Sequence, residues 1–531
     1  MATSWWRRLA SWAQLSNVPR PDRSDFSRSA HSERSTIMAG EVDDIVLSST
    51  LWSELRSHLL STSGKPGGRR PGDEQMAFIL AAPNVSASRI RLVGHELLRA
   101  QPTDLDHQSP SAISPNGQFV ATALTRCRRE GWSLIEVHSH PFDSASHTTF
   151  SGIDWSNDRM KMPRLASMLP ESFYHATMVV GQNSLDAHYY QRTISTIRPV
   201  RQVTIVGSFS DDSPVLHYFP ASSSAAASAL PPDARHDRQL PLLGVATQEA
   251  LSKARVAVVG LGGLGSFVAL ELAYLGVGHL ILIDPDRIEL SNLNRLIGAG
   301  PDDVGRYKVD VFRDLIGRLT PRVAVTAVAA PLLDNGALQH AKAADLLLGC
   351  VDTHGARLSL NHLSIRYLIP LIDAGTGARL GTDSRDAKLG GQVQIVAPGV
   401  GCLECRSFIH PQRAAYDLAP PEMQEYERDH GYGTEQAMPS VIFLNGVVAS
   451  MQVAETARTF AAVSAPEDVT PKLVMYDARA QQTFPAAVRY SPECATCGTH
   501  GVTGLADLAP LQAAFQAAPT ARPAFARASL S

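Results

Sequence analysis

The order of apolar and polar residues along the chain predicts two α/β regions in succession. In the first region, the apolar runs at 76–82 (MAFILAA) and 133–137 (SLIEV) have the length of buried strands, and the stretch 117–131 has the spacing of a helix. In the second region, the stretch 256–283 alternates a short apolar run, a glycine-rich turn and a longer apolar segment. This order predicts strand, turn, helix and strand, as in a sheet covered by helices.

Composition separates the two regions. A chain of 531 residues is too long for a single hydrophobic core. The run PASSSAAASALPPDA has the small residues and prolines of a flexible linker. We therefore expect a first domain over 42–215, a linker over 216–234, a second domain over 235–505 and a tail over 506–531. Residues 1–41 are expected to be disordered, or an over-long start with Met38 as the true initiator.

Charge and hydropathy exclude some classes of function. The formal net charge of −3 lacks the basic field that nucleic acids or anionic membranes attract, so we expect neither as a partner. The N-terminus has no continuous apolar core of the signal-peptide kind, which predicts a cytoplasmic protein. Function must therefore come from local sites.

Two histidines end the second strand of the first domain, in the stretch LIEVHSHP at 134–141. His138 and His140 lie two positions apart, so in a strand they share one face. The residues that follow supply Ser151 and Asp154. Two imidazoles and a carboxylate leave one zinc position open, which is the arrangement of a catalytic zinc. Glu74, just before the strand at 76–82, is the candidate general base. A polar turn with two unliganded histidines and a plain surface glutamate is the alternative.

The stretches EQMAFILA, HSHP and SGID together resemble the signature of the JAMM (MPN-type) zinc metalloproteases, which cut peptide or isopeptide bonds after ubiquitin-like proteins. The resemblance implies a cytidine-deaminase-like α/β fold. It implies His138, His140 and Asp154 as zinc ligands, Glu74 as base and Ser151 as a donor to the oxyanion. Ten residues, 141–150, separate His140 from Ser151, three more than is usual in the family. Asp158 is therefore the reserve ligand, and His147 is expected to be a solvated loop histidine.

A glycine-rich turn follows the first strand of the second domain, with Gly260, Gly262, Gly263 and Gly265. Such a turn lets a backbone approach phosphates at a helix N-terminus, but it fits NAD and ATP equally well. Cationic, amide and carboxylate groups downstream favour a triphosphate and its magnesium over NAD. These groups are Asp284, Asp286, Asn292, Asn294, Arg295, Lys308 and Asp352.

These stretches, with ARHDRQL, KLVMYDA, CLEC and CATC, resemble the ThiF/MoeB/ubiquitin-activating adenylyltransferases over 235–505. The resemblance implies a Rossmann-like fold in which Asp284 holds the ribose and Asp352 holds Mg²⁺. Phosphates would be held by Asn294, Arg295 and Lys308. Arg238 would reach the nucleotide of the other subunit in a homodimer. Leu296 departs from the family, which usually has glutamine there.

The cysteines fall into two groups. Two C-x-x-C pairs predict a closed structural zinc site, with two redox pairs as the alternative, at Cys402, Cys405, Cys494 and Cys497. Some members of the resembling superfamily use a thioester cysteine, but residues 413–440 contain none. Cys350, on an apolar strand, is expected to be a core thiol, and Cys127 to be inert.

We expect a cytoplasmic, homodimeric enzyme that adenylates the C-terminal glycine of a ubiquitin-like protein with ATP and Mg²⁺. A fused zinc peptidase would process that protein or its conjugates, and a conjugating enzyme is a further possible partner. Two alternatives stay open. One is activation of a sulfur-carrier protein in cofactor biosynthesis, and the other is a catalytically silent module that binds ubiquitin-like proteins.

Overall fold

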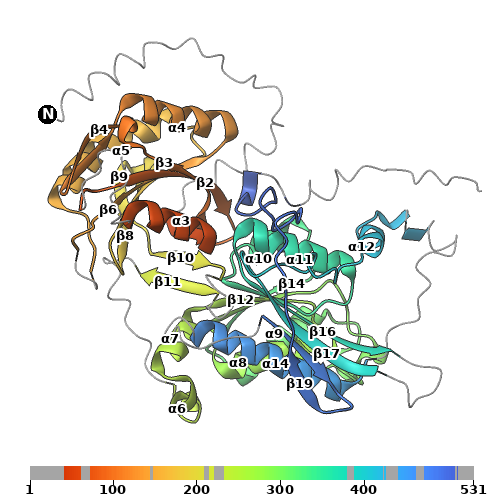
Figure 1. Cartoon of the computed structure of the whole chain (residues 1–531). Coiled ribbons are helices and arrows are strands. Elements are labelled where there is room, and N and C mark those ends of the chain that lie inside the picture. Colours follow the sequence, from red (N-terminus) through yellow and green to blue (C-terminus); the bar gives the residue numbers. More distant parts are fainter. Residues whose placement is uncertain are drawn as a thin grey trace, which may run out of the picture.

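A computed structural model gives the structure of the chain (Figure 1). It describes residues 41–60, 72–143, 147–208, 215–220, 233–379, 388–422, 424–425, 440–461, 472–508 and 511. The predictions for residues 1–40, for the linker residues 221–232 and for most of the tail lie outside the described residues.

The first domain is built on a nine-stranded mixed sheet. Both of its strands predicted from sequence, and the helix at 117–131, are confirmed. In spatial order the strands are β11 (Leu216–Pro220), β10 (Gln202–Val206), β1 (Val42–Ser48), β3 (Ile90–Arg99), β2 (Met76–Val85), β6 (Ser133–Ser139), β7 (His175–Val180), β8 (Leu185–Gln191) and β9 (Thr196–Pro199). A separate hairpin joins β4 (Leu105–Ser109) and β5 (Ala112–Pro115).

Helices cover both faces of this sheet. Alternate residues of β2 point to opposite faces, so Ile79 packs in the cluster of α3 (Ser49–Leu60) and Phe78 packs in the cluster of α4 (Gly117–Glu130). The third helix, α5 (Gly152–Met168), lies on the same face as α4 through Leu165. The sheet extends through β11, which lies within the range expected to be linker, because β11 pairs antiparallel with β10.

The second domain is built on an eight-stranded sheet. Its first five strands are parallel and the rest are antiparallel, and the predicted strand, turn, helix and strand at 256–283 is confirmed. The strands are β14 (Ala324–Val328), β13 (His279–Ile283), β12 (Arg255–Val259), β15 (Leu346–Gly349), β16 (Leu371–Arg379), β17 (Lys388–Val396), β18 (Leu473–Asp477) and β19 (Gln482–Pro485). The helices are α6 (Leu240–Leu243), α7 (Val245–Lys253), α8 (Gly263–Leu275), α9 (Lys308–Leu319), α10 (Asn335–Ala341), α11 (His354–Tyr367), α12 (Pro411–Asp417) and α14 (Ile442–Ala461).

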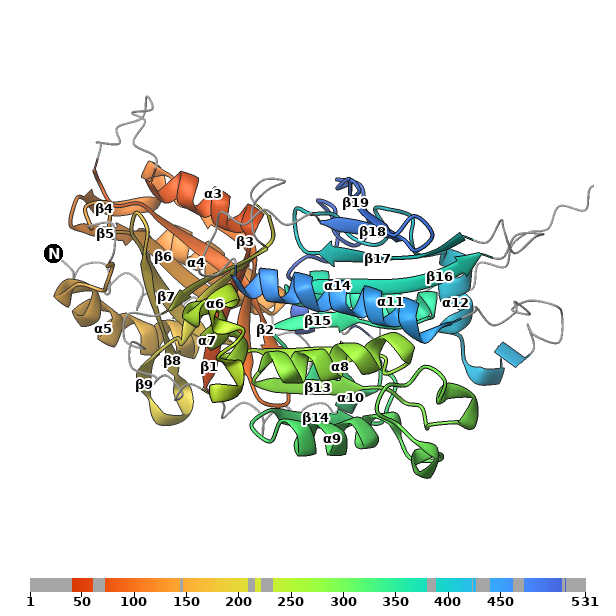
Figure 2. The same cartoon turned by 90° about the horizontal axis from the view of Figure 1, so that it is seen from below.

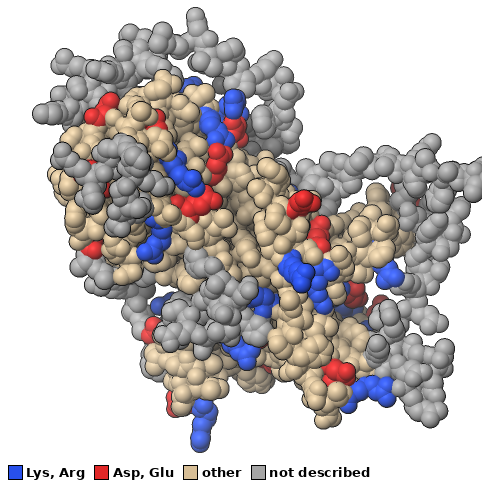
Figure 3. Space-filling model, in the orientation of Figure 1, with Lys and Arg blue, Asp and Glu red and all other residues tan. Residues whose placement is uncertain are grey.

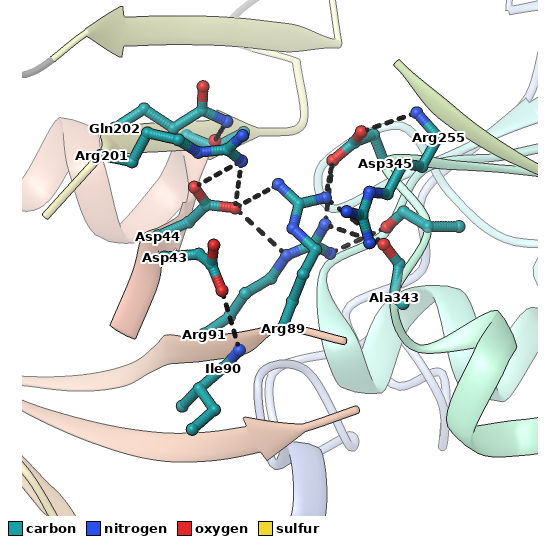
Figure 4. Close-up of polar contacts among 12 residues, drawn as sticks. Asp43, Asp44, Arg89, Ile90, Arg91, Arg201, Gln202, Arg255, Ala343 and Asp345 are labelled. Carbon is teal, nitrogen blue, oxygen red and sulfur yellow. Dashed lines mark hydrogen bonds and ion pairs between the residues drawn. The ribbon is translucent and has the colours of Figure 1, made fainter. Parts of the chain in front are cut away.

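A buried ion cluster joins the two domains (Figure 4). Arg89 contacts Asp44 at 2.8 Å and Asp345 of the second domain at 2.5 Å. Arg91 contacts Asp345 at 2.9 Å, and the other Asp345 oxygen accepts from the backbone of Arg255 at 2.9 Å. Removing one member of such a cluster leaves a buried charge without its partner, which costs about 3–5 kcal/mol. The cluster therefore fixes how the domains are oriented.

A segment in the predicted tail also bridges the domains. Asp507 accepts from the backbone of Val85 at 2.8 Å and from Lys342 and Tyr367 of the second domain at 2.6 and 2.9 Å. It lies in a short 3-10 turn, Ala506–Leu508, and Ala506 is fully buried. The ordered chain thus continues past 505 and returns to the first domain.

The domains meet at the amino ends of the second sheet's strands (Figure 2). Arg255 is the first residue of β12 and Asp345 immediately precedes β15, whereas the glycine turn begins at Gly260 after β12 has ended. In the first domain, the last residue of β2 meets Asp507, whereas its first residue, Met76, pairs with His138. The histidines and the glycine turn therefore lie at opposite ends of the joined domains.

The surface shows no concentration of one charge on the face drawn in Figure 3, where cationic and anionic side chains are interspersed. Within the described residues, no helix combines the length and hydropathy needed to span a bilayer.

Candidate functional sites

The pairing of β2 with β6 places the first cluster. Met76 pairs with His138, and continuing this antiparallel register sets Glu74 opposite His140. Backbone bonds continue the pairing beyond the strands, because Ser139 donates to the carbonyl of Gln75 at 2.9 Å. The hydroxyl of Ser139 accepts from the amide of Gln75, also at 2.9 Å. The base predicted from sequence is thus held beside a predicted ligand.

His138, His140 and Asp154 come together as predicted. Their ligand atoms all lie within 4.8 Å of one another. Asp154 Oδ1 is 3.4 Å from His138 Nε2, and Asp154 Oδ2 is 3.3 Å from His140 Nε2. Glu74 Oε1 is 3.9 Å from His140 Nε2. Two imidazole nitrogens and one carboxylate oxygen fit zinc with one position left open.

Ser151 lies next to Asp154 because both cap α5. The hydroxyl of Ser151 accepts from the amide of Asp154 at 3.2 Å, and Asp154 Oδ2 accepts from the amide of Ser151 at 2.7 Å. This reciprocal pair is a capping box, which explains why the helix begins at this point. A side-chain hydrogen bond from Ser151 also contributes to lowering the pKa of the Asp154 carboxyl.

Burial raises the pKa of Glu74 to about 7. The charges of Asp154 and Asp143 act in the same direction, and those of His138 and His140 oppose it. The side chain is 5% exposed, so solvent stabilises its charge poorly. A carboxylate with a pKa near neutrality exchanges protons readily at physiological pH, as a general base must.

Two neighbouring residues have roles that the sequence did not indicate. Asp158, the reserve ligand, is 1% exposed and accepts from His188 Nε2 at 2.7 Å, so it lies outside the metal cluster. Asp143 Oδ2 is 3.2 Å from His140 Nδ1 and would fix the orientation of that ring. The sequence signal that could have identified Asp143 is an acidic residue three positions after His140. His147 is exposed, as expected.

The glycine turn of the second domain is tightly packed on one side and open on the other. Gly260 has φ +89°, and a Cβ there would lie 2.6 Å from the carbonyl oxygen of Cys350. A Cβ on Gly265 would lie 1.9 Å from the oxygen of Gly260. A Cβ on Gly262, the N-cap of α8, would meet nothing within 4 Å. The open side exposes the helix start, where backbone N–H groups bind anions.

Two carboxylates and a lysine lie beside this turn. Asp284, 3% exposed, accepts from the amides of Leu261 at 2.6 Å and Asp286 at 2.8 Å. Burial raises its pKa. Lys308 Nζ is 2.7 Å from Asp286 Oδ2 and 3.8 Å from Asp284 Oδ1. Asp284 thus braces the turn itself, and Lys308 is held at its edge.

Other predicted residues lie on loops, where Arg295 is half-buried and Asn294, Asp352 and Arg238 are exposed. Arg295 donates to Asn294 Oδ1 at 3.2 Å, and its Cδ would lie 3.3 Å from a Cβ on Gly263, so both are near the turn. Asp352 is exposed in the loop after β15, three residues beyond the strand's end at Gly349. Arg238 is exposed in the segment before α6, apart from these groups. Asn445 of α14 was not predicted, yet its Nδ2 would lie 2.2 Å from a Cβ on Gly263.

Two cysteines lie apart from the C-x-x-C pairs: Cys127 is buried in the core, whereas Cys350, expected to be a core thiol, is only partly buried. Cys350 is half-buried beneath the glycine turn and donates to Gln452 Oε1 at 3.3 Å, and burial raises its pKa far above the usual range. Cys127 is fully buried, and burial raises its pKa to about 12. Neither thiol forms a thiolate near neutral pH.

The four remaining thiols form a compact cluster. Cys402 Sγ is 3.6 Å from Cys494 Sγ, and Cys405 Sγ is 3.3 Å from Cys497 Sγ. All four sulfurs lie within 4.8 Å of one another and none is in a disulfide. This donor set fits a closed, structural zinc site that joins two distant segments of the chain.

Comparison with known proteins shows which proteins the second domain is similar to. The ThiF family matches residues 236–497. The molybdopterin-synthase adenylyltransferase of Escherichia coli (strain K12) is 33% identical over 269 residues, which cover 50% of this chain and 96% of that protein. The sulfur carrier protein ThiS adenylyltransferase of the same organism is 30% identical over 268 residues, covering 50% and 94%. A crystal structure of E. coli MccB with ATP, at 24% identity, covers 50% of this chain and 75% of that chain with a TM-score of 0.39.

Proposed function

Because this chain belongs to the ThiF family, we propose that it adenylates the C-terminal carboxylate of a small ubiquitin-like or sulfur-carrier protein, and that its first domain is a JAMM-type zinc peptidase. The adenylating half is supported by the matched relatives. The peptidase half is supported by one observation. Glu74, just before β2, converges with His138 and His140 at the end of β6 and with Asp154 at the start of α5. A silent binding module would have no need for a buried carboxylate beside three potential ligands.

In the second domain, the open side of the glycine turn would receive the phosphates of ATP. Arg295, Asn294 and Lys308 would neutralise them, Asp284 would brace the turn and contact the ribose, and Asp352 would hold Mg²⁺, which offsets the charge of the triphosphate. The partner's carboxylate then attacks the α-phosphorus, pyrophosphate leaves and an acyl-adenylate forms. Lys308 Nζ, 2.7 Å from Asp286, carries three N–H donors and could contact a phosphate as well.

In the first domain, Glu74 would take a proton from the attacking water and pass it to the leaving nitrogen. Ser151 would donate its hydroxyl proton to the oxyanion. Zinc, when bound, would supply the Lewis acid that polarises the scissile carbonyl. The pKa of Glu74, near 7, suits a group that must both accept and release a proton.

The fixed arrangement of the two domains determines how far apart the two proposed activities lie. The metal cluster is at the start of β2, about 30 Å along the strand from the interface, and the glycine turn is a further ~15 Å beyond it along β12. The partner would therefore leave the peptidase, diffuse and bind again for adenylation.

This separation has a direct test. Radiolabelled precursor with extra residues after its glycine is given to the enzyme together with excess unlabelled, pre-trimmed partner. Free diffusion predicts that the unlabelled partner dilutes the labelled adenylate in proportion to its concentration. Labelled adenylate that resists dilution would show direct transfer and contradict the separation.

We further propose a homodimer through α8 and α14. These helices border a groove of about 640 Å³ lined largely by apolar side chains, and Phe443 in it is 62% exposed. A second copy would cover this face. Phe443→Glu should convert the dimer to a monomer in sedimentation equilibrium, whereas a wild type that is already monomeric would contradict the proposal.

The partner is either a conjugated ubiquitin-like protein or a sulfur carrier. The absence of cysteine from 413–440 favours a sulfur carrier, because no thioester residue is available there. A conjugating enzyme would be needed only in the first case.

The overall proposal is tested with a small ubiquitin-like or sulfur-carrier protein that ends in glycine. The wild type should catalyse partner-dependent ATP–pyrophosphate exchange and zinc-dependent cleavage of an extended precursor. Exchange without cleavage of precursor or conjugate would leave only the adenylating half.

A further inference from the structure

His188 on β8 is the residue around which the ligand-bearing helix is packed, although it belongs to neither motif. Its ring centroid is 4.0 Å from that of Phe150 and 4.8 Å from that of Trp155, and the residue is 2% exposed. Phe150 in turn lies 6.2 Å from the ring of the predicted ligand His138. A line of rings thus runs from the metal cluster to His188.

A buried polar chain starts from the same imidazole. His188 Nε2 is 2.7 Å from Asp158 Oδ2, and Asp158 Oδ1 is 3.0 Å from Lys161 Nζ. Lys161 Nζ is also 2.6 Å from Glu136 Oε1. Glu136 is two positions before His138 on β6, so both lie on the same face of that strand. The ring contacts and the polar contacts therefore both connect β6 with α5, the strand and the helix that carry the ligands.

The first turn of α5 needs such support. The loop that leads from β6 to α5 is longer than usual for the resembling family. The buried residues of α5 begin at Asp158, so residues 152–157 have no buried side chain to hold them. Asp154 lies one helical turn before Asp158, and its position therefore follows that of Asp158.

We propose that His188 is a positioning residue for the metal site. It holds the start of α5 against β6, so that Asp154 and Ser151 reach His138 and His140. Its Nε2–H fixes Asp158, and its ring packs between Phe150 and Trp155. This inference rests on the proposed zinc peptidase. Partners that orient ligands in this way typically change metal affinity or activity 10- to 100-fold.

The test is titration of the full chain with Co²⁺, with the four-thiolate site already filled by zinc. His188→Phe keeps a ring but loses the donor to Asp158. It should weaken Co²⁺ binding at the histidine site about 10- to 100-fold, shift its d–d bands and lower kcat with little change in KM. His188→Gln, which restores a donor, should recover part of the affinity.

The matched control is His95→Phe on β3, which replaces an imidazole that also stacks on an aromatic ring, Trp132, and also makes one ring-nitrogen hydrogen bond, to the carbonyl of Thr503. It should leave the Co²⁺ affinity and spectrum unchanged, and all three variants should adenylate pre-trimmed partner normally. Wild-type affinity and spectrum in His188→Phe would overturn the inference while leaving the peptidase intact. A wild type with no Co²⁺ site at the histidines would overturn the proposed peptidase as well.

Discussion

The two candidate sites differ in how far their side chains are already arranged. In the first domain, Glu74 and His138 are 5% and 6% exposed, and the ligand atoms face one another across a few ångströms. In the second domain, Asp352 is exposed, Arg295 is half-buried, and Lys308 is paired with Asp286. In the second domain, the part of the site that is already in place is the backbone of the glycine turn.

The difference fits what each site is proposed to bind. A metal ion needs ligands held to within fractions of an ångström, so they come from strand ends and a capped helix. A triphosphate brings its own charges, and exposed cationic loops can close on it while the helix start supplies fixed N–H groups. Changing one residue at each site should therefore have distinct consequences.

The largest effect is expected at the nucleotide site. Asp352→Ala removes the carboxylate proposed to hold Mg²⁺ and should lower partner-dependent ATP–pyrophosphate exchange at least about 10³-fold. Cleavage of the extended precursor should continue at the wild-type rate. Asp302→Ala, at another exposed carboxylate of the same domain, is the control. Exchange at the wild-type rate in Asp352→Ala would remove this residue from the site.

The converse effect, loss of cleavage with adenylation retained, is expected at the metal site. Glu74→Gln keeps the shape of the side chain but cannot accept a proton, so precursor cleavage should fall about 10²- to 10⁴-fold. The variant should retain its zinc by elemental analysis and adenylate pre-trimmed partner normally. Glu54→Gln on α3, a surface carboxylate, is the control. If the variant still consumes ATP on the extended precursor, trimming does not precede activation and removal of conjugates becomes the better role.

Removal of metal by chelation should distinguish two zinc ions, because their ligands differ. Mild chelation should remove the ion bound by two histidines and an aspartate together with the peptidase activity, and leave the four-thiolate ion and adenylation intact. Cys494→Ser should instead lower the melting temperature by several degrees, because it loosens a link between segments 92 residues apart. Freshly purified protein with only one zinc per chain would argue against the first site.

The smallest effect is a pH-dependent change in stability. In the chain without the histidine-bound metal, the pKa of Glu74 is raised from 4.5 to about 7, so the folded state binds this proton more tightly than the unfolded state. The stabilisation is complete below pH 4.5 and is lost as pH rises through 7, by about 3 kcal/mol. Urea unfolding of Glu74→Gln and wild type should therefore diverge by that amount between pH 4.5 and 8, in favour of the variant. A difference that does not vary with pH would mean that Glu74 is not held in a desolvated environment.

Motifs and periodicity predicted much of how the candidate residues of the first domain are placed. The strands at 76–82 and 133–137 are present, His138 and His140 share a face, and Asp154 joins them despite the longer loop. These predictions succeeded because they depend on local spacing and on the chemistry of each side chain. The expected ends of the domains were less accurate, since β11 and the turn at 506–508 pack against distant segments.

The sequence by itself determined the chemistry available to this protein: a glycine turn at a helix start, four thiols in two pairs, and two histidines with nearby carboxylates. Local backbone preferences and side-chain types suffice for these features. Only the tertiary structure decided which carboxylate faces the histidines, that Asp158 instead binds His188, and that Arg89, Arg91 and Asp345 fix the domains with their sites apart. These outcomes depend on contacts between residues up to 256 positions apart, whose burial leaves each charge dependent on its partner. Such pairings have no signature in the spacing of residues along one chain.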